Sequence, residues 1–209
     1  HHVDWATRAI DLAIAAGVKK IVRLSVAAAA MTPGIQLGRW HRTVERYLKD
    51  SGVDYTIVRP VPYMQNFLRL FVPVNGRYMA PLEYGKISFI DTTDVGRFVA
   101  WAMLNEGAVN QTYLVTGQEL ASTQEAVDRI NSAIGSNLQY NNTSHADWDN
   151  LVPNTPLPEW IHPILKELYT VFGKGVVTMQ NDTFEACTGF KTGSIEAFAQ
   201  RELSALKAL

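Results

Sequence analysis

Several residues whose side chains could bind or protonate a ligand follow one predicted strand. Arg59 and Pro60 end this strand, and in open α/β folds ligands bind at the carboxyl ends of the strands. Just beyond them, Tyr63, Asn66 and Phe67 face either a substrate or the core. Tyr63 is the one phenol near this point that can serve as a proton donor. The segment therefore predicts a small-molecule site, with a buried core segment as the alternative.

The remaining reactive side chains do not form a recognisable catalytic or metal-binding set. Cys187 is the single cysteine, so it can form neither an internal disulfide nor a thiolate metal cluster. His145 and His162 lie too far in sequence from carboxylate partners to indicate a metal site. Asp91 and Asp94 are predicted to cap a helix rather than to act as catalytic acids. We expect no metal.

Composition narrows the classes of protein that remain. Of the 209 residues, 47% are hydrophobic and 19% are charged, which predicts a packed core rather than disorder. The 19 Lys+Arg nearly balance the 20 Asp+Glu, so there is no basic excess to bind nucleic acid directly. No apolar run approaches the ~20 residues that span a membrane. We expect a soluble, cytoplasmic protein of one domain, or of one domain with an appendage, that acts on a small molecule.

The start of the chain predicts a helix with no strand before it. Apolar residues at helical spacing run from 3 to 14, Gly17 provides a helix end, and residues 21–26 form a short buried strand. A helix that feeds a buried strand is typical of the middle of a βαβ series, so we expect the chain to be a fragment. A tag remnant is the alternative for His1 and His2, but it would not explain the missing strand.

The alternation of strands and helices continues through the first half of the chain. We predict helices at 40–49, 63–72 and 91–104, and strands at 53–60, 86–90 and 111–116. Strands separated by helices of this length imply a parallel sheet with helices on both faces, an α/β fold.

The pattern changes after Gly117. Helices are predicted from 122 to 134, from 164 to 172 and from 194 to 209. Residues 137–144 form a loop or an edge strand, and 150–163 carry four prolines that exclude a regular element. We interpret residues 118–209 as a small, mainly helical lobe that packs on the sheet at the substrate side.

Five segments, taken in order, resemble the NmrA-like family of atypical short-chain dehydrogenase/reductases. They are GVKKIVRLS at 17–25, residues 45–60, YMQNF at 63–67, FIDTTDV at 89–95 and YLVTG at 113–117. We take the resemblance to extend over residues 9 to about 135, and within the family the sequence resembles the festuclavine-dehydrogenase-like group and then the type 2 quinone oxidoreductases. The resemblance implies that residues 1–117 are the C-terminal part of a Rossmann-like, NAD(P)-binding domain.

The glycine-rich phosphate-binding loop of that family has no counterpart in this sequence. No G-x-x-G-x-x-G occurs in it, so roughly 60 to 90 residues of the family's N-terminal region are expected to be absent. Because the loop binds pyrophosphate through backbone N–H groups, side chains elsewhere cannot replace it. We expect NADP or NAD to bind the complete protein, and to bind this chain weakly or not at all.

The resemblance also assigns catalytic positions. Ser25 matches the serine that polarises a substrate carbonyl, but Leu37 and His41 stand where the family's tyrosine and lysine are expected. Leucine cannot donate a proton, which argues against simple ketone reduction. An iminium or a conjugated acceptor takes hydride without concerted protonation. Ser25 and Tyr63 are therefore the candidate catalytic residues.

Contacts with the cofactor and the substrate follow from the same alignment. Ser25, His41, Pro60 and Val61 are the candidate cofactor-binding residues. The alternatives are that Ser25 only caps a loop and that His41 is solvated on a surface helix. If the alignment is right, Ser25, Leu37 and His41 converge with Tyr63 near the carboxyl ends of the first two strands.

An apolar substrate pocket is predicted beneath the C-terminal lobe. Tyr63, Asn66, Phe67 and Trp148 are its candidate substrate-binding residues, with Met64 and Phe71 adding apolar surface.

Three functions remain open. The first is an NAD(P)H-dependent reductase of an imine, a quinone or another conjugated acceptor. The second is a regulatory protein that senses NAD(P) without turnover, favoured by Leu37 and His41. The third is a truncated product unable to bind cofactor. The substrate, the choice between NAD and NADP, and the oligomeric state are left open.

Overall fold

A parallel sheet of three strands forms one half of the computed structural model, which describes residues 2–32, 34–71, 73–74, 76–82, 85–176 and 178–209. The strands are β1 (Lys20–Leu24), β2 (Asp54–Pro60) and β5 (Gln111–Val115), in the order β1-β2-β5. Leu24 pairs with Val58, and Pro60 pairs with Val115, so the carboxyl ends of all three strands lie at one edge. The predicted α/β fold with a parallel sheet is confirmed.

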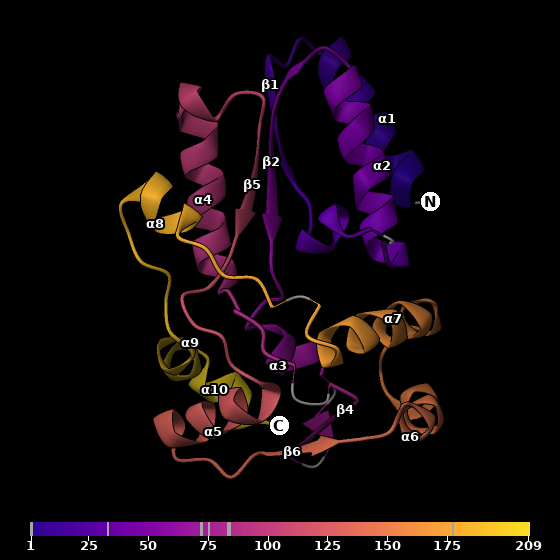
Figure 1. Cartoon of the computed structure of the whole chain (residues 1–209), viewed down its shortest axis with the longest axis vertical. Coiled ribbons are helices and arrows are strands. Elements are labelled where there is room, and N and C mark those ends of the chain that lie inside the picture. The colour runs from indigo at the N-terminus through magenta and orange to yellow at the C-terminus, as the bar shows by residue number, and fades with distance from the viewer. Residues whose placement is uncertain (1, 33, 72, 75, 83–84, 177) are drawn as a thin grey trace.

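Helices cover both faces of this sheet (Figure 1). Helices α1 (His2–Ala15) and α2 (Gln36–Asp50) pack on one face, through a core of Ile10, Val44, Leu48 and Ile57. Helix α4 (Thr92–Leu104) and the short α8 (Thr183–Thr188) pack on the other, through Val58, Val95, Phe98, Val115 and Phe184. Successive residues of a strand point to opposite faces, so Ile57 and Val58 belong to different cores.

The other half of the molecule is mostly helical and lies beyond the carboxyl ends of the strands (Figure 1). Its helices are α3 (Asn66–Arg69), α5 (Thr123–Ile134), α6 (His145–Leu151), α7 (His162–Gly173), α9 (Ile195–Arg201) and α10 (Leu203–Leu206). A small sheet joins β3 (Pro73–Val74), β4 (Arg77–Ala80) and β6 (Gln139–Asn142). Its core draws on residues 64–89 as well as on residues 121–206, and the domain boundary at 117 stays a prediction.

Short 3-10 turns connect several of these elements. They are η1 (Ala27–Ala30), η2 (Glu106–Ala108), η3 (Val152–Asn154) and η4 (Glu159–Ile161). Of these, η1 matters most for the site, because it follows β1 at the carboxyl edge of the sheet.

The helix predicted at 194–209 is divided into α9 and α10, and two predicted elements in the first half of the chain are shorter than expected, because tertiary pairing overrides local pattern. Of the helix predicted at 63–72, whose last residue lies outside the described residues, Asn66–Arg69 is helical, while Tyr63 forms a β-bridge with Ile90 instead. The strand predicted at 86–90 consists of two isolated bridges, the second between Ile87 and Ala121. The polar stretch 137–144 does contain a strand, which pairs in parallel with β4.

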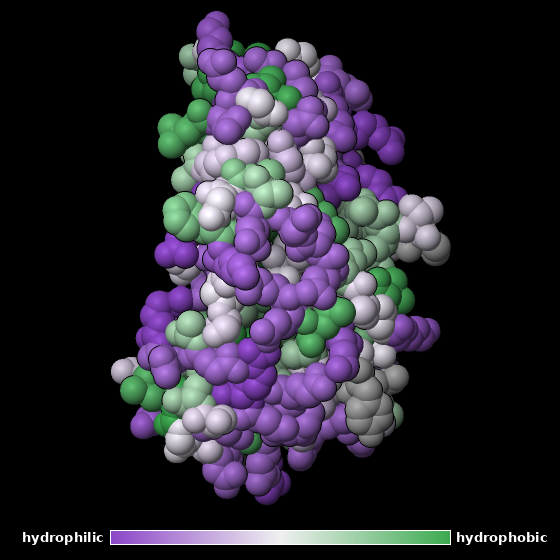
Figure 2. Space-filling view, turned by 60° about the vertical axis from the view of Figure 1, so that its left-hand side comes forward, coloured by the Kyte–Doolittle hydropathy of each residue, from purple (hydrophilic) through white to green (hydrophobic). Residues whose placement is uncertain are grey.

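Hydrophilic side chains dominate the face over α4 and α8, and hydrophobic residues appear there only in small groups (Figure 2). None of the helices in the described ranges has the length and apolar character needed to cross a bilayer.

Candidate functional site

A cavity of about 160 Å³ lies where β1 and β2 end. Its walls come from three parts of the chain: η1 with the start of α2, the segment after β2, and α7. The lining residues are Val26, Ala27, Ala28, Leu37, Pro60, Val61, Pro62, Tyr63, Asn66, Leu70, Leu168, Tyr169 and Phe172. Among the described residues that line it there is no charged side chain, so the cavity suits a neutral, largely apolar ligand.

Tyr63 and Asn66 supply polar groups to this lining. Within the described residues, neither the Tyr63 hydroxyl nor the Asn66 carboxamide makes a hydrogen bond. Burial raises the pKa of the Tyr63 phenol, so this group stays protonated at neutral pH. The pair therefore offers a ligand one hydroxyl donor and one amide with both donor and acceptor atoms.

Helix α7 closes the cavity on the side away from the sheet. Its Tyr169 donates a hydrogen bond from the hydroxyl to the Leu70 carbonyl, at 2.9 Å, so this phenol is not free for a ligand. Glu167 accepts a hydrogen bond from the backbone N–H of Gln36, the first residue of α2. A carboxylate is favourable at a helix N-terminus, where the N–H groups have no partner inside the helix. The contact ties α7 to α2 across the cavity.

The wall formed by η1 and α2 depends on close backbone approach. A Cβ added at Gly38 would lie 2.3 Å from the carbonyl oxygen of Ala28, so this position has no space for a side chain. Arg42, one turn later on α2, donates from Nε to the Ala29 carbonyl at 2.7 Å and from Nη2 to the Met31 carbonyl. These contacts hold Ala27 and Ala28 against the cavity.

A buried glutamate lies behind the cavity. Glu45 of α2, 2% exposed, accepts a hydrogen bond from the hydroxyl of Ser25 at 2.5 Å. It also accepts from Arg59 at both carboxylate oxygens, with Nε 2.9 Å from Oε1. Burial by itself would raise the pKa of Glu45, but the hydrogen bonds from Arg59 and Ser25 outweigh it and lower that pKa below the usual value. Glu45 is therefore a carboxylate, and the Ser25 proton is engaged with it.

Ser25 lies next to the cavity rather than in its lining. It directly follows β1 and is 1% exposed, and its backbone N–H donates to the Val58 carbonyl. Tyr63 follows β2, so the two candidate catalytic residues lie at the same edge of the sheet, as expected. In this arrangement the Ser25 hydroxyl does not offer its proton to a carbonyl in the cavity.

His41 lies one helical turn after Leu37, outside the cavity lining. Its ring centroid is 5.0 Å from that of His2. Desolvation, with Arg23 and His2 nearby, lowers the pKa of His41 to about 4. The imidazole is therefore neutral at pH 7 and cannot supply the positive charge of the lysine that the resemblance led us to expect at this position.

The structure divides the remaining predicted residues into two groups. Pro60, Val61, Tyr63 and Asn66 line the cavity together, with Leu37 opposite them. The other group, Phe67 and Trp148 with Met64 and Phe71, is buried in the core and lies outside the lining.

Trp148 nevertheless supports the cavity wall from behind. Its ring packs edge-on against Tyr169 with centroids 5.0 Å apart, and Tyr169 is a wall residue. Trp148 therefore supports the cavity through Tyr169 and is not placed to contact a ligand itself.

Sequence reasoning missed Glu45 and the residues of α7. A signal for Glu45 was present, because positions 37, 41, 45 and 48 share one face of a helix whose other buried members are apolar. A glutamate on a buried face needs a partner, which turns out to be Arg59. Nothing in the local sequence pattern linked residues 168–172 to the cavity residues at 60–66, which lie about a hundred positions earlier in the chain.

Among the described residues, no group of three or more histidine, cysteine, aspartate or glutamate side chains is arranged to hold a metal ion.

Known proteins with related sequences include reductases. The NAD(P)H azoreductase of Xenophilus azovorans is 28% identical over 208 residues, which are 99% of this chain and 73% of that protein. The festuclavine dehydrogenase of Aspergillus fumigatus is also 28% identical, over 96% of this chain and 70% of its own length. Among solved structures, an NADPH-dependent quinone oxidoreductase from Escherichia coli, complexed with NADPH, superposes with a TM-score of 0.83 at 24% identity. That match covers 95% of this chain and 70% of the other.

The superposition confirms the Rossmann-like fold that was expected from the sequence. The sequence pattern of the NmrA-like family matches residues 1–207, nearly the whole chain. The chain belongs to the NmrA-like family.

Proposed function

We propose that this chain carries the substrate half of an NAD(P)H-dependent reductase that acts on a small, neutral, conjugated acceptor such as a quinone or an imine. The observation that carries the proposal is the cavity at the carboxyl edge of the sheet, whose described lining is uncharged and whose Tyr63 and Asn66 side chains make no hydrogen bond within the described part of the chain. The activities named for the azoreductase, the festuclavine dehydrogenase and the quinone oxidoreductase support it.

The residues present fit one half of the cofactor. Pro60 and Val61 give an apolar wall against which a nicotinamide ring can pack, and Asn66 offers amide hydrogen bonds to a carboxamide. The sequence contains no glycine-rich loop for the pyrophosphate, and neutral His41 does not replace one. When bound, the reduced cofactor supplies a hydride.

Within this site, each side chain has a role that follows from its chemistry. Tyr63 donates its hydroxyl proton in a hydrogen bond to the acceptor's oxygen or nitrogen, which polarises that atom. Leu37 offers no proton, so an acceptor that needs concerted protonation, such as a simple ketone, is disfavoured. Leu168 and Phe172 of α7 exclude water from the reacting face.

The size of the cavity sets a limit on the acceptor. An apolar cavity of about 150 Å³ is known to hold benzene, so about 160 Å³ accommodates roughly one ring. A larger acceptor or a stacked nicotinamide has to project through the open side.

The proposal is tested by supplying a hydride donor that matches the residues present. Reduced nicotinamide mononucleotide lacks the adenosine half, so we expect it to bind this chain about as well as NADPH does. With either donor, 1,4-benzoquinone should be reduced above the non-enzymatic rate, whereas cyclohexanone should not. Tyr63→Phe should lower the benzoquinone rate about tenfold while leaving donor binding unchanged. Donor binding without turnover of any conjugated acceptor would favour the regulatory alternative, and equal rates for both acceptors would contradict the role given to Leu37.

A further inference from the structure

We infer that Glu45 is a positioning residue that sets the shape of the cavity by tying three of its wall segments together. Its carboxylate binds the hydroxyl of Ser25 and the guanidinium of Arg59. Each partner directly precedes part of the wall: Val26 follows Ser25, and Pro60 follows Arg59. Glu45 itself lies two turns after Leu37 on α2, so one carboxylate connects η1, the end of β2 and the start of α2.

A carboxylate suits this junction because all the groups that meet it are donors. Arg59 presents two N–H groups and Ser25 one O–H group, and an ionised carboxylate only accepts. The carboxylate end of the junction is shielded from water, since the Glu45 side chain is 3% exposed, while the Arg59 side chain is 19% exposed. Glutamine has nearly the same shape, but its NH₂ group would face a donor. Replacing the carboxylate by an amide therefore displaces a wall segment without changing the packed volume.

Glu45 acts through its neighbours and not on the ligand. It is absent from the cavity lining, and the Ser25 hydroxyl is directed to it rather than to the cavity. The inference goes beyond the reductase proposal, because it concerns the shape of the cavity whichever acceptor enters it.

The experiment measures the cavity with a ligand that has no redox chemistry. Toluene is neutral and has one ring, and the methyl resonances of Ala27 and Ala28 report its binding by NMR. We expect Glu45→Gln to raise the Kd for toluene about tenfold and to shift both alanine methyls in the free protein. The matched control is Asp94→Asn. Asp94 is also 2% exposed and also pairs with an arginine, Arg97, but it lies on α4 at the opposite face of the sheet.

The control separates positioning from general loosening. Asp94→Asn should leave the Kd for toluene within about twofold of the wild-type value. If both variants weaken toluene binding equally, or if Glu45→Gln lowers thermal stability with an unchanged Kd, Glu45 has only a structural role and the inference is overturned. A wild-type chain that binds no toluene overturns it as well.

A second variant covers the case in which Glu45→Gln does not fold. Ser25→Ala removes one donor and leaves the Glu45–Arg59 pair, so it should shift the methyl of Ala27 more than those of Val61. Equal shifts at Ala27 and Val61 would contradict the idea that Ser25 holds the η1 wall while Arg59 holds the wall after β2. If the wild-type chain does not reduce benzoquinone but the toluene results are as expected, the reductase proposal fails and this inference stands.

Discussion

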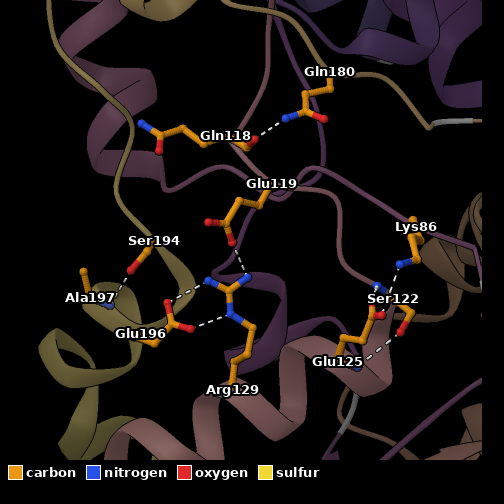
Figure 3. Close-up of polar contacts among 10 residues, drawn as sticks. All are labelled: Lys86, Gln118, Glu119, Ser122, Glu125, Arg129, Gln180, Ser194, Glu196 and Ala197. Carbon is orange, nitrogen blue, oxygen red and sulfur yellow. Dashed lines mark hydrogen bonds and ion pairs between the residues drawn. The ribbon is translucent and has the colours of Figure 1, made fainter.

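Arg59 and Arg129 each hold a glutamate with two nitrogens, one behind the cavity and the other at the surface. Arg129 of α5 binds Glu196 of α9 through Nε at 2.5 Å and Nη2 at 2.8 Å, and Glu119 through Nη1 at 2.5 Å (Figure 3). The Arg59–Glu45 pair has the same two-pronged geometry. Their exposure differs: the side chain of Glu196 is 41% exposed, whereas that of Glu45 is 3% exposed.

This difference in exposure indicates different roles for the surface cluster (Arg129, Glu196 and Glu119) and for the buried cluster (Glu45, Arg59 and Ser25). Water competes for the charges of the surface cluster, so it adds little to stability and mainly sets the approach of α9 to α5. Water has little access to the Glu45 carboxylate, whose side chain is 3% exposed, so Glu45 depends on Arg59, and loss of Arg59 leaves an uncompensated buried charge. The same pairing geometry therefore makes Arg129–Glu196 a surface clamp between α5 and α9, and makes Arg59–Glu45 a structural requirement of the cavity.

The largest effect is expected when the buried pair loses one partner. Glu45→Ala leaves Arg59 without its carboxylate and should lower the free energy of unfolding by about 3 kcal/mol. Urea unfolding followed by circular dichroism measures this. A loss below about 1 kcal/mol would show that the buried cluster behaves like a surface pair.

Removing both buried charges should cost less than removing one. Glu45→Met combined with Arg59→Met leaves no unpaired charge, so the double variant should be more stable than Glu45→Met alone, by about 1 kcal/mol or more. The same unfolding assay on the four proteins of a double-mutant cycle gives the coupling free energy. Additive losses would show that the two side chains do not depend on each other.

Acid should weaken the buried cluster more than the surface one. The folded-state pKa of Glu45 lies below its usual value, so the stabilisation is complete at pH values above the usual glutamate pKa and is lost as the pH falls. The charged and titratable neighbours of Glu45 are Arg23, Arg59, His41 and Lys49.

Glu196 follows the same sign in acid, with hydrogen bonds from Arg129 lowering its pKa to about 2, but solvent screens much of that effect. Thermal unfolding between neutral pH and pH 3 should therefore show a shallower acid loss for Glu45→Gln than for Glu196→Gln. The reverse order would contradict the comparison of the two clusters.

The smallest effect is expected at the surface clamp. Arg129→Gln should lower the free energy of unfolding by at most about 1 kcal/mol, and the loss should shrink in about 0.5 M salt. The loss caused by Glu45→Ala should change little in the same salt. Equal salt dependence in the two variants would show that water reaches both clusters.

The sheet and its helices could be predicted because they rest on local periodicity. Ile57 and Val58 alternate between two cores, and Asp91 caps α4 by accepting from the N–H of Thr93, as its position suggested. The cavity could be predicted only in part. Pro60 ends a strand and Val61, Tyr63 and Asn66 follow it, so these residues could be found from that position.

Leu168, Tyr169 and Phe172 reach the cavity through tertiary packing that leaves no local mark. Phe67 illustrates the opposite difficulty. Its spacing is compatible with a core and with a pocket alike, and its three edge-on aromatic neighbours place it in the core.

The edge-on contact between Trp148 and Tyr169 links a buried indole to a residue that lines the cavity, so intrinsic fluorescence can report on the cavity. Trp148 is fully buried, Trp40 and Trp101 are partly buried, and Trp5 and Trp160 are 74% and 67% exposed, so acrylamide should quench Trp5 and Trp160 most and Trp148 least. Excitation absorbed by Tyr169 passes to an indole whose centroid is 5.0 Å away. Because Tyr169 also lines the cavity, we expect a molecule that enters it to change the emission of Trp148, so that occupancy can be followed by fluorescence without attaching a dye.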